Sequence, residues 1–175
     1  TMAEILGLPI PDEGPAFLVI LLIHILAGLT GVICGATAAL TRKGSPTHVR
    51  FGRIYGWALV AIIATMAAMA AMRWQDNWHL VPISLVAGTA LAIGWLDRRH
   101  TTEGHDRVHL VAMGCSYVAL LTGFYVDNGP HLPLWQYLPD WSFWVLPSLV
   151  GLPIIWAAVR RRPTPHPATS PPEPQ

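Results

Sequence analysis

Histidines are the residues of this chain best suited to chemistry, because eight of them occur in a sequence in which only 12% of residues are charged. A neutral imidazole nitrogen binds zinc, copper or iron. His105 and His109 are four residues apart and would share one face of a helix, which is a common geometry for two ligands of one metal ion. His48 is a candidate third ligand. No carboxylate of an HExxH-type motif accompanies them.

Heme is the second candidate ligand, because its iron needs only one or two axial side chains such as histidine or methionine. The candidate axial ligands for one heme are His48, His105, His109 and Met113. A second heme, at the opposite end of the molecule, would take His24 and His79. His24, however, lies much deeper in its apolar segment than His79 does in its own.

His24 poses a separate question, because it lies inside the apolar run 17–40. An ionisable side chain at that depth needs a partner. The depth of a residue can be counted from the outer end of its apolar segment, at about 1.5 Å per residue. This count places Tyr117, in the fourth such segment of the chain, at the depth of His24, in the first. The structural alternative to a heme ligand is therefore a hydrogen bond to a hydroxyl on a neighbouring helix. The sequence favours this alternative, with Tyr117 as the first candidate.

The elements that must position these residues are membrane-spanning helices. The chain is 53% hydrophobic, and its 12% of charged residues is about half the usual fraction in a soluble domain, about 25%. A span needs roughly 20 apolar residues. Five segments of about that length lack Asp, Glu, Lys and Arg: 16–40, 54–72, 79–96, 108–126 and 141–159. We predict an all-α, integral membrane helical bundle of five transmembrane helices.

Three regions follow from these segments. Residues 1–15 form an outer N-terminal segment, and residues 16–162 form the transmembrane domain. The sequence PTPHPATSPPEPQ, residues 163–175, is too rich in proline and too poor in apolar residues to build a core. We predict that it is a disordered cytoplasmic tail.

Basic residues predict the orientation. Ten of the eleven lysines and arginines fall on one side of the predicted spans, and Arg73 alone falls on the other. The positive-inside rule makes the basic side cytoplasmic. We therefore expect a multi-pass protein of a bacterial inner membrane, with its N-terminus outside and its C-terminus in the cytoplasm.

Two stretches look like copies of one hairpin. Residues 35–56 and 88–114 each contain a glycine, a run of small residues, a basic loop and a His-x-Arg triplet, which begins at His48 in the first and at His105 in the second. This pattern suggests two parallel hairpin repeats with a fifth helix added.

Small residues recur at four-residue spacing, most clearly at Gly31 and Gly35, and allow helices to approach closely in lipid. They would pack the bundle itself or attach it to another subunit. An accessory subunit of a larger membrane complex, or a homo-oligomer, is thus an alternative function. Nucleic-acid binding has no support, because no basic run is interleaved with aromatic residues. No Ser-His-Asp set or phosphate-binding loop indicates hydrolysis.

The stretch HVRFGRIYGWA, residues 48–58, resembles the His-Arg-x-x-Gly-Arg-x-Tyr signature of an uncharacterised bacterial membrane-protein family, catalogued as domain of unknown function 2306. The matching residues are His48, Gly52, Arg53 and Tyr55. Val49 replaces the usual arginine, and Arg50 is positioned to compensate for it.

A second segment, HLVAMGCSY, resembles the same family through His109, Met113 and Tyr117, and His24 matches a histidine early in its first span. The resemblance covers most of residues 16–126. It implies a fold type and no particular activity.

These observations predict a small, non-hydrolytic membrane protein that binds heme or another redox cofactor; whether it is an enzyme stays open. Beside His48, Arg53 could hold an anionic group such as a heme propionate or a quinone headgroup. The predicted metal ligands are His105 and His109. The predicted cofactor-binding residues are His24, His48, Arg53, His109, Met113 and Tyr117.

Overall fold

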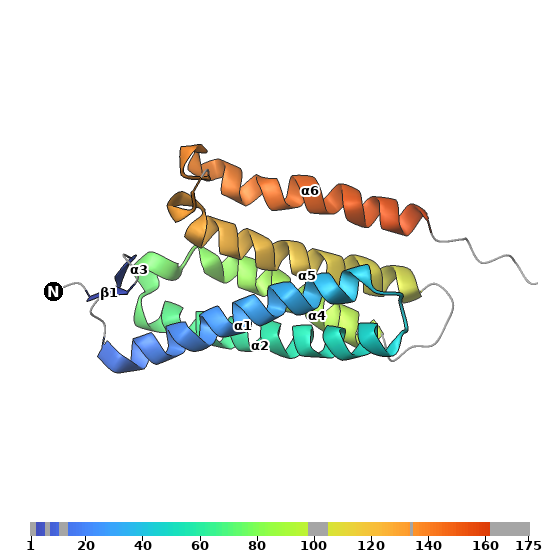
Figure 1. Ribbon diagram of the computed structural model, residues 1–175, viewed down its shortest axis with the longest axis horizontal. Helices are drawn as coiled ribbons and strands as arrows, with labels where there is room; N and C mark the ends of the chain where they lie inside the picture. Colours follow the sequence, from blue (N-terminus) through green and yellow to red (C-terminus); the bar gives the residue numbers. More distant parts are fainter. Residues whose placement is uncertain (1–2, 6–7, 11–13, 98–104, 134, 162–175) are drawn as a thin grey trace, which may run out of the picture.

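The computed structural model is a bundle of long helices lying roughly side by side (Figure 1). It describes residues 3–5, 8–10, 14–97, 105–133 and 135–161. The predicted tail at 163–175 lies outside the described residues, as does part of the N-terminal segment. The long helices are α1 (Gly14–Leu40), α2 (Pro46–Met72), α4 (Leu80–Asp97), α5 (His105–Asn128) and α6 (Asp140–Arg160).

Each of these five helices is long and apolar enough to cross a membrane, so the predicted spans and the helical bundle are confirmed. The chain is a multi-pass membrane protein. Its short elements include a pair of antiparallel strands, in which Glu4 lies opposite Pro9. The sequence pattern does not predict these strands. These short elements are β1 (Ala3–Ile5), β2 (Leu8–Ile10), α3 (Trp74–Asn77), η1 (Gly129–His131) and η2 (Trp135–Tyr137).

Helix α2 begins at Pro46, well before the apolar segment that starts at residue 54. The side-chain oxygen of Ser45 accepts a hydrogen bond from the backbone N–H of His48 at 3.2 Å, and Pro46 occupies the first helical position. Serine before the helix and proline at its first position are both strong start signals. The basic segment HVRFGR therefore forms the first turns of α2, and His48 is in its first turn.

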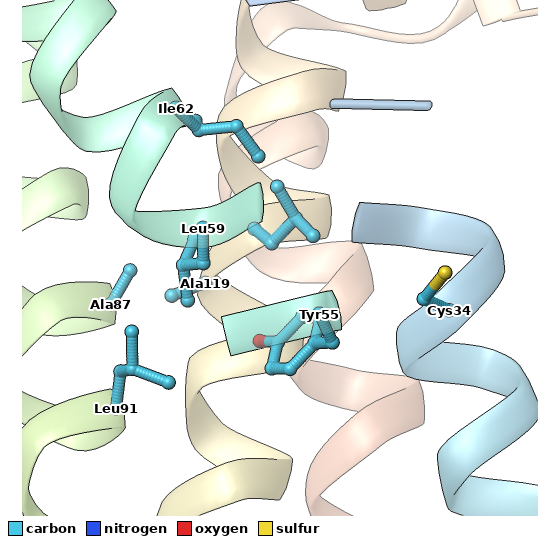
Figure 2. Close-up of a cluster of buried hydrophobic side chains, with 8 residues drawn as sticks. Cys34, Tyr55, Leu59, Ile62, Ala87, Leu91 and Ala119 are labelled. Atoms are coloured by element: carbon cyan, nitrogen blue, oxygen red, sulfur yellow. The ribbon is translucent and has the colours of Figure 1, made fainter. Parts of the chain in front are cut away.

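Four helices share one core. Side chains from α1, α2, α4 and α5 meet in it, while α6 packs against α5 (Figure 1). Figure 2 shows Tyr55, Leu59 and Ile62 of α2 pointing into the space between the other helices. The buried members of this core are Cys34, Tyr55, Leu59, Ile62, Ala87, Leu91, Ala119 and Leu120.

Glycines of α1 let that helix lie close to its neighbours. A Cβ atom added at Gly35 would lie 2.5 Å from Cε2 of Tyr117 and 2.9 Å from Cδ2 of Tyr55. One added at Gly31 would lie 3.4 Å from side-chain atoms of Ile62 and of Leu120. The predicted small-residue face of α1 therefore packs inside this chain.

Replacing Gly35 by alanine tests this close approach. We expect Gly35→Ala to destabilise the protein by about 1–3 kcal/mol, because the added methyl group overlaps two tyrosine rings. Gly28→Ala is the matched control on the same helix, since a Cβ atom there has nothing within 4 Å. Thermal unfolding in detergent measures both variants. Equal melting temperatures for the two variants would contradict the close contact.

Candidate metal or cofactor site

His48 closes the first hairpin. Its Nδ1 lies 2.9 Å from the carbonyl oxygen of Ala38, close to the C-terminus of α1. The last four carbonyls of a helix have no partner within that helix. The imidazole of His48, fixed in the first turn of α2 by the Ser45 cap, therefore supplies a donor to one of them.

His109 closes the second hairpin in the same way. Its Nδ1 lies 2.9 Å from the carbonyl oxygen of Gly94, within the last turn of α4. His109 is in the second turn of α5, so the two histidines occupy corresponding places in the two helical hairpins. The predicted repeat pairs His48 with His105, whereas the hydrogen bond that matches that of His48 is made by His109.

These contacts fix the protonation pattern of both rings. A carbonyl oxygen only accepts hydrogen bonds, so each Nδ1 must carry the proton and donate it. In the neutral imidazole, Nε2 then carries the lone pair. A metal-ligating histidine almost always donates its other ring N–H to a carbonyl, carboxylate or water, and the Nδ1 contacts of His48 and His109 are of this kind.

The two rings lie close together in a T-shaped arrangement. The ring centroids of His48 and His109 are 6.4 Å apart, and the ring planes meet at 76°. The structure thus brings together two of the histidines that the sequence marks as ligands. The His105 side chain is outside the described part of the chain, so the predicted His105–His109 metal pair is not placed. In the described part, no group of three or more His, Cys, Asp or Glu side chains could hold a metal ion.

Met113 lies one helical turn beyond His109. A Cβ atom added at Gly94 would be 2.7 Å from the sulfur of Met113, so this thioether packs directly on the residue whose carbonyl holds His109. The sulfur and the imidazole therefore lie against the same turn of α4.

Two tyrosines lie about two helical turns deeper than the histidines. The hydroxyl of Tyr55 lies 2.7 Å from Oγ of Ser116, which donates to the carbonyl of Met113 at 2.8 Å. Because the Ser116 proton is used in that bond, Tyr55 donates to Ser116. Tyr117 donates to the carbonyl of Val32 at 3.0 Å, and its ring centroid is 6.0 Å from that of Tyr55.

His24 is far from this site and has its own partner. Its Nδ1 lies 2.8 Å from Oγ1 of Thr65 on α2. Thr65 Oγ1 also donates to the carbonyl of Ala61 at 2.7 Å, so His24 donates to the threonine oxygen. The expected hydroxyl partner is present, but the choice of Tyr117 is wrong. Tyr117 instead reaches the carbonyl of Val32, because α1 extends beyond the outer end of α5 and equal residue counts from the two helix ends do not give equal depth (Figure 1).

The remaining predicted residues lie elsewhere. Arg53 is exposed and lines a groove on the surface of α1 and α2, away from the core into which Tyr55 points. His79, the proposed outer heme ligand, lies between the rings of Trp78 and Trp144, with centroids 6.3 Å away in each case. His24 and His79 therefore have separate partners.

Three participants are not singled out from the sequence. The carbonyls of Ala38 and Gly94 carry no side-chain signal at all. Thr65 could have been found, because it is one of few hydroxyl-bearing residues in the second predicted span. A count of its distance from the outer end of that span would have made it a candidate partner for His24.

A double-mutant cycle tests the His24–Thr65 contact. His24→Phe and Thr65→Val each remove one partner, and we expect a coupling energy of about 0.6 kcal/mol, the average for hydrogen bonds inside membranes. Thr65→Ser is the control, because it keeps the hydroxyl and should retain most of the coupling. Reversible unfolding in mixed micelles gives the four stabilities. Strictly additive single-variant effects would show that the contact contributes nothing.

The pairing of His48 with His109 is the observation from which a function can be inferred. No protein-family model, curated protein or solved structure matches this chain. The resemblance of residues 48–58 to the domain of unknown function 2306 family therefore stays a prediction.

Proposed function

We propose that this membrane protein binds a transition-metal centre, as heme iron or as a metal ion, through Nε2 of His48 and of His109. One observation carries the proposal. Two imidazoles from different hairpins, each anchored through Nδ1 to a backbone carbonyl at 2.9 Å, form a T-shaped pair with centroids 6.4 Å apart.

The spacing suits ligands on opposite sides of one metal. A metal–nitrogen bond is about 2.0 Å long, and the ring centroid lies about 1.1 Å behind the nitrogen, so two opposed imidazoles have centroids about 6.2 Å apart. Tetrahedral ligation would bring them to about 5 Å. If both Nε2 atoms were turned towards one centre, the 6.4 Å separation would let His48 and His109 hold it between them, as heme iron or as a metal ion.

The surroundings favour a redox-active centre over a hydrolytic one. Met113 packs on the same turn of α4 that holds His109, and a thioether is a soft ligand that suits copper(I) and heme iron. Tyr55 and Tyr117, two turns deeper, extend a line of polar side chains from the histidine pair into the core.

The proposal includes an orientation. The loops that join α1 to α2 and α4 to α5, together with the helix starts that follow them, carry seven of the eleven basic residues, and the positive-inside rule favours a cytoplasmic location for them. With the N-terminus outside, the histidine pair would lie at the cytoplasmic side of a bacterial inner membrane.

Substitution by asparagine separates ligation from helix capping. The amide nitrogen of asparagine can take the place of Nδ1 as donor to the carbonyl, but asparagine has no counterpart of Nε2. We expect His48→Asn and His109→Asn to keep the stability of the protein within about 1 kcal/mol and to weaken metal or heme binding at least about tenfold. His79→Asn is the control with unchanged binding.

The measurement is a titration of the purified protein with hemin, and separately with copper(I) and zinc. A Soret band at one heme per chain identifies heme, whereas one bound ion per chain without a Soret response identifies a metal ion. Unchanged binding in both asparagine variants would refute the assignment of the ligands. A folded wild-type protein that binds none of the three probes would refute the proposed function.

A further inference from the structure

A groove between α1 and α2 has one charged residue and otherwise mostly apolar walls. It is a shallow, open groove of about 540 Å³ on the side of the bundle. Arg53 marks the end of the groove nearest the basic loops, and Ile23 marks its far end. The residues that line it are Ile23, Leu26, Ala27, Thr30, Arg53, Ile54, Trp57 and Ala58.

The charge of Arg53 is uncompensated within the described chain. No carboxylate among the described residues forms an ion pair with it, and its side chain is exposed. Arg53 lies seven residues into α2, about 10 Å from the start of the helix, where hydrocarbon gives way to headgroups. A guanidinium at that depth extends towards the polar boundary and pairs with an anion there.

The walls suit an alkyl chain. Leu26 is 56% exposed and Trp57 is 63% exposed, and both face the groove. The one hydroxyl in the groove, that of Thr30, donates to the carbonyl of Leu26 at 2.8 Å, so its proton is already used within α1. From Ile23 to Thr30 the groove follows α1 for about 10 Å, parallel to the direction of an acyl chain in the bilayer.

We propose that this groove binds one anionic phospholipid from the leaflet on the basic side of the protein. Its phosphate pairs with Arg53, and one of its acyl chains lies between α1 and α2 along Leu26 and Trp57. The complementary charge at one end of the groove and the apolar walls beyond it match a phosphate-headed lipid in both polarity and direction.

Native mass spectrometry with defined lipids tests the proposal. The probes are phosphatidylglycerol, which is anionic, and phosphatidylcholine, which carries the same phosphate beside a cation. We expect the detergent-purified protein to bind one phosphatidylglycerol about fivefold more tightly than phosphatidylcholine, as one arginine near the membrane surface would give.

Three variants locate the site. Arg53→Gln should abolish the preference for phosphatidylglycerol. Thr30→Trp should fill the groove and lower the affinity for both lipids while leaving every charge in place. Arg107→Gln, a matched loss of charge on α5, should behave as wild type.

Several results would overturn the proposal. Equal loss of preference in Arg107→Gln and Arg53→Gln would show diffuse surface charge and no site. Unchanged affinity in Thr30→Trp would place the lipid elsewhere. A dimer that Thr30→Trp disrupts, without any bound lipid, would assign the groove to a second copy of the chain. A melting temperature within a few degrees of wild type confirms that each variant is folded.

Discussion

The contact of two tyrosine rings with Gly35 sets the spacing of α1 against α2 and α5. Tyr55 comes from α2 and Tyr117 from α5, and both rings occupy the space that a side chain at position 35 would fill. This contact draws α1 against both helices at one level, so that Tyr117 reaches the carbonyl of Val32. Because α2 and α5 are held together here, His48 and His109, about two turns nearer the basic loops, form a T-shaped pair with centroids 6.4 Å apart.

A second constraint explains where the polar side chains point. The membrane interior offers no water, so each buried donor must find an acceptor within the protein. His48, His109 and Tyr117 donate to backbone carbonyls of other helices, which are acceptors that every sequence provides. Two of these carbonyls lie at helix ends, where they lack partners within the helix. The two histidines therefore stabilise the hairpins through Nδ1.

Composition alone was enough to predict the five spans, because a membrane helix needs only length and an absence of charge. The pairing of side chains was much less predictable. The sequence offered His48, His105 and Met113 as partners of His109, and only the rotation of α2 and α5 about their axes selects His48 among the described ones. The partner of His24 was missed because the outer ends of α1 and α5 are not level, whereas the same residue count on α2 would have indicated Thr65. The early start of α2 could have been predicted from Ser45 and Pro46, because serine before a helix and proline at its first position are start signals.

The two proposed sites are physically separate although both depend on α2. His48 and Arg53 are five residues apart, which places them about 140° apart around the helix. One faces α5 inside the bundle, and the other faces the groove beside α1. Loss of the Arg53 charge therefore leaves the anchoring hydrogen bond of His48 intact, and loss of the His48 ligand leaves the groove open. If metal binding and lipid binding were nevertheless coupled, the coupling would have to pass through a tilt of α2 against α1, and the tyrosine contacts at Gly35 oppose that movement.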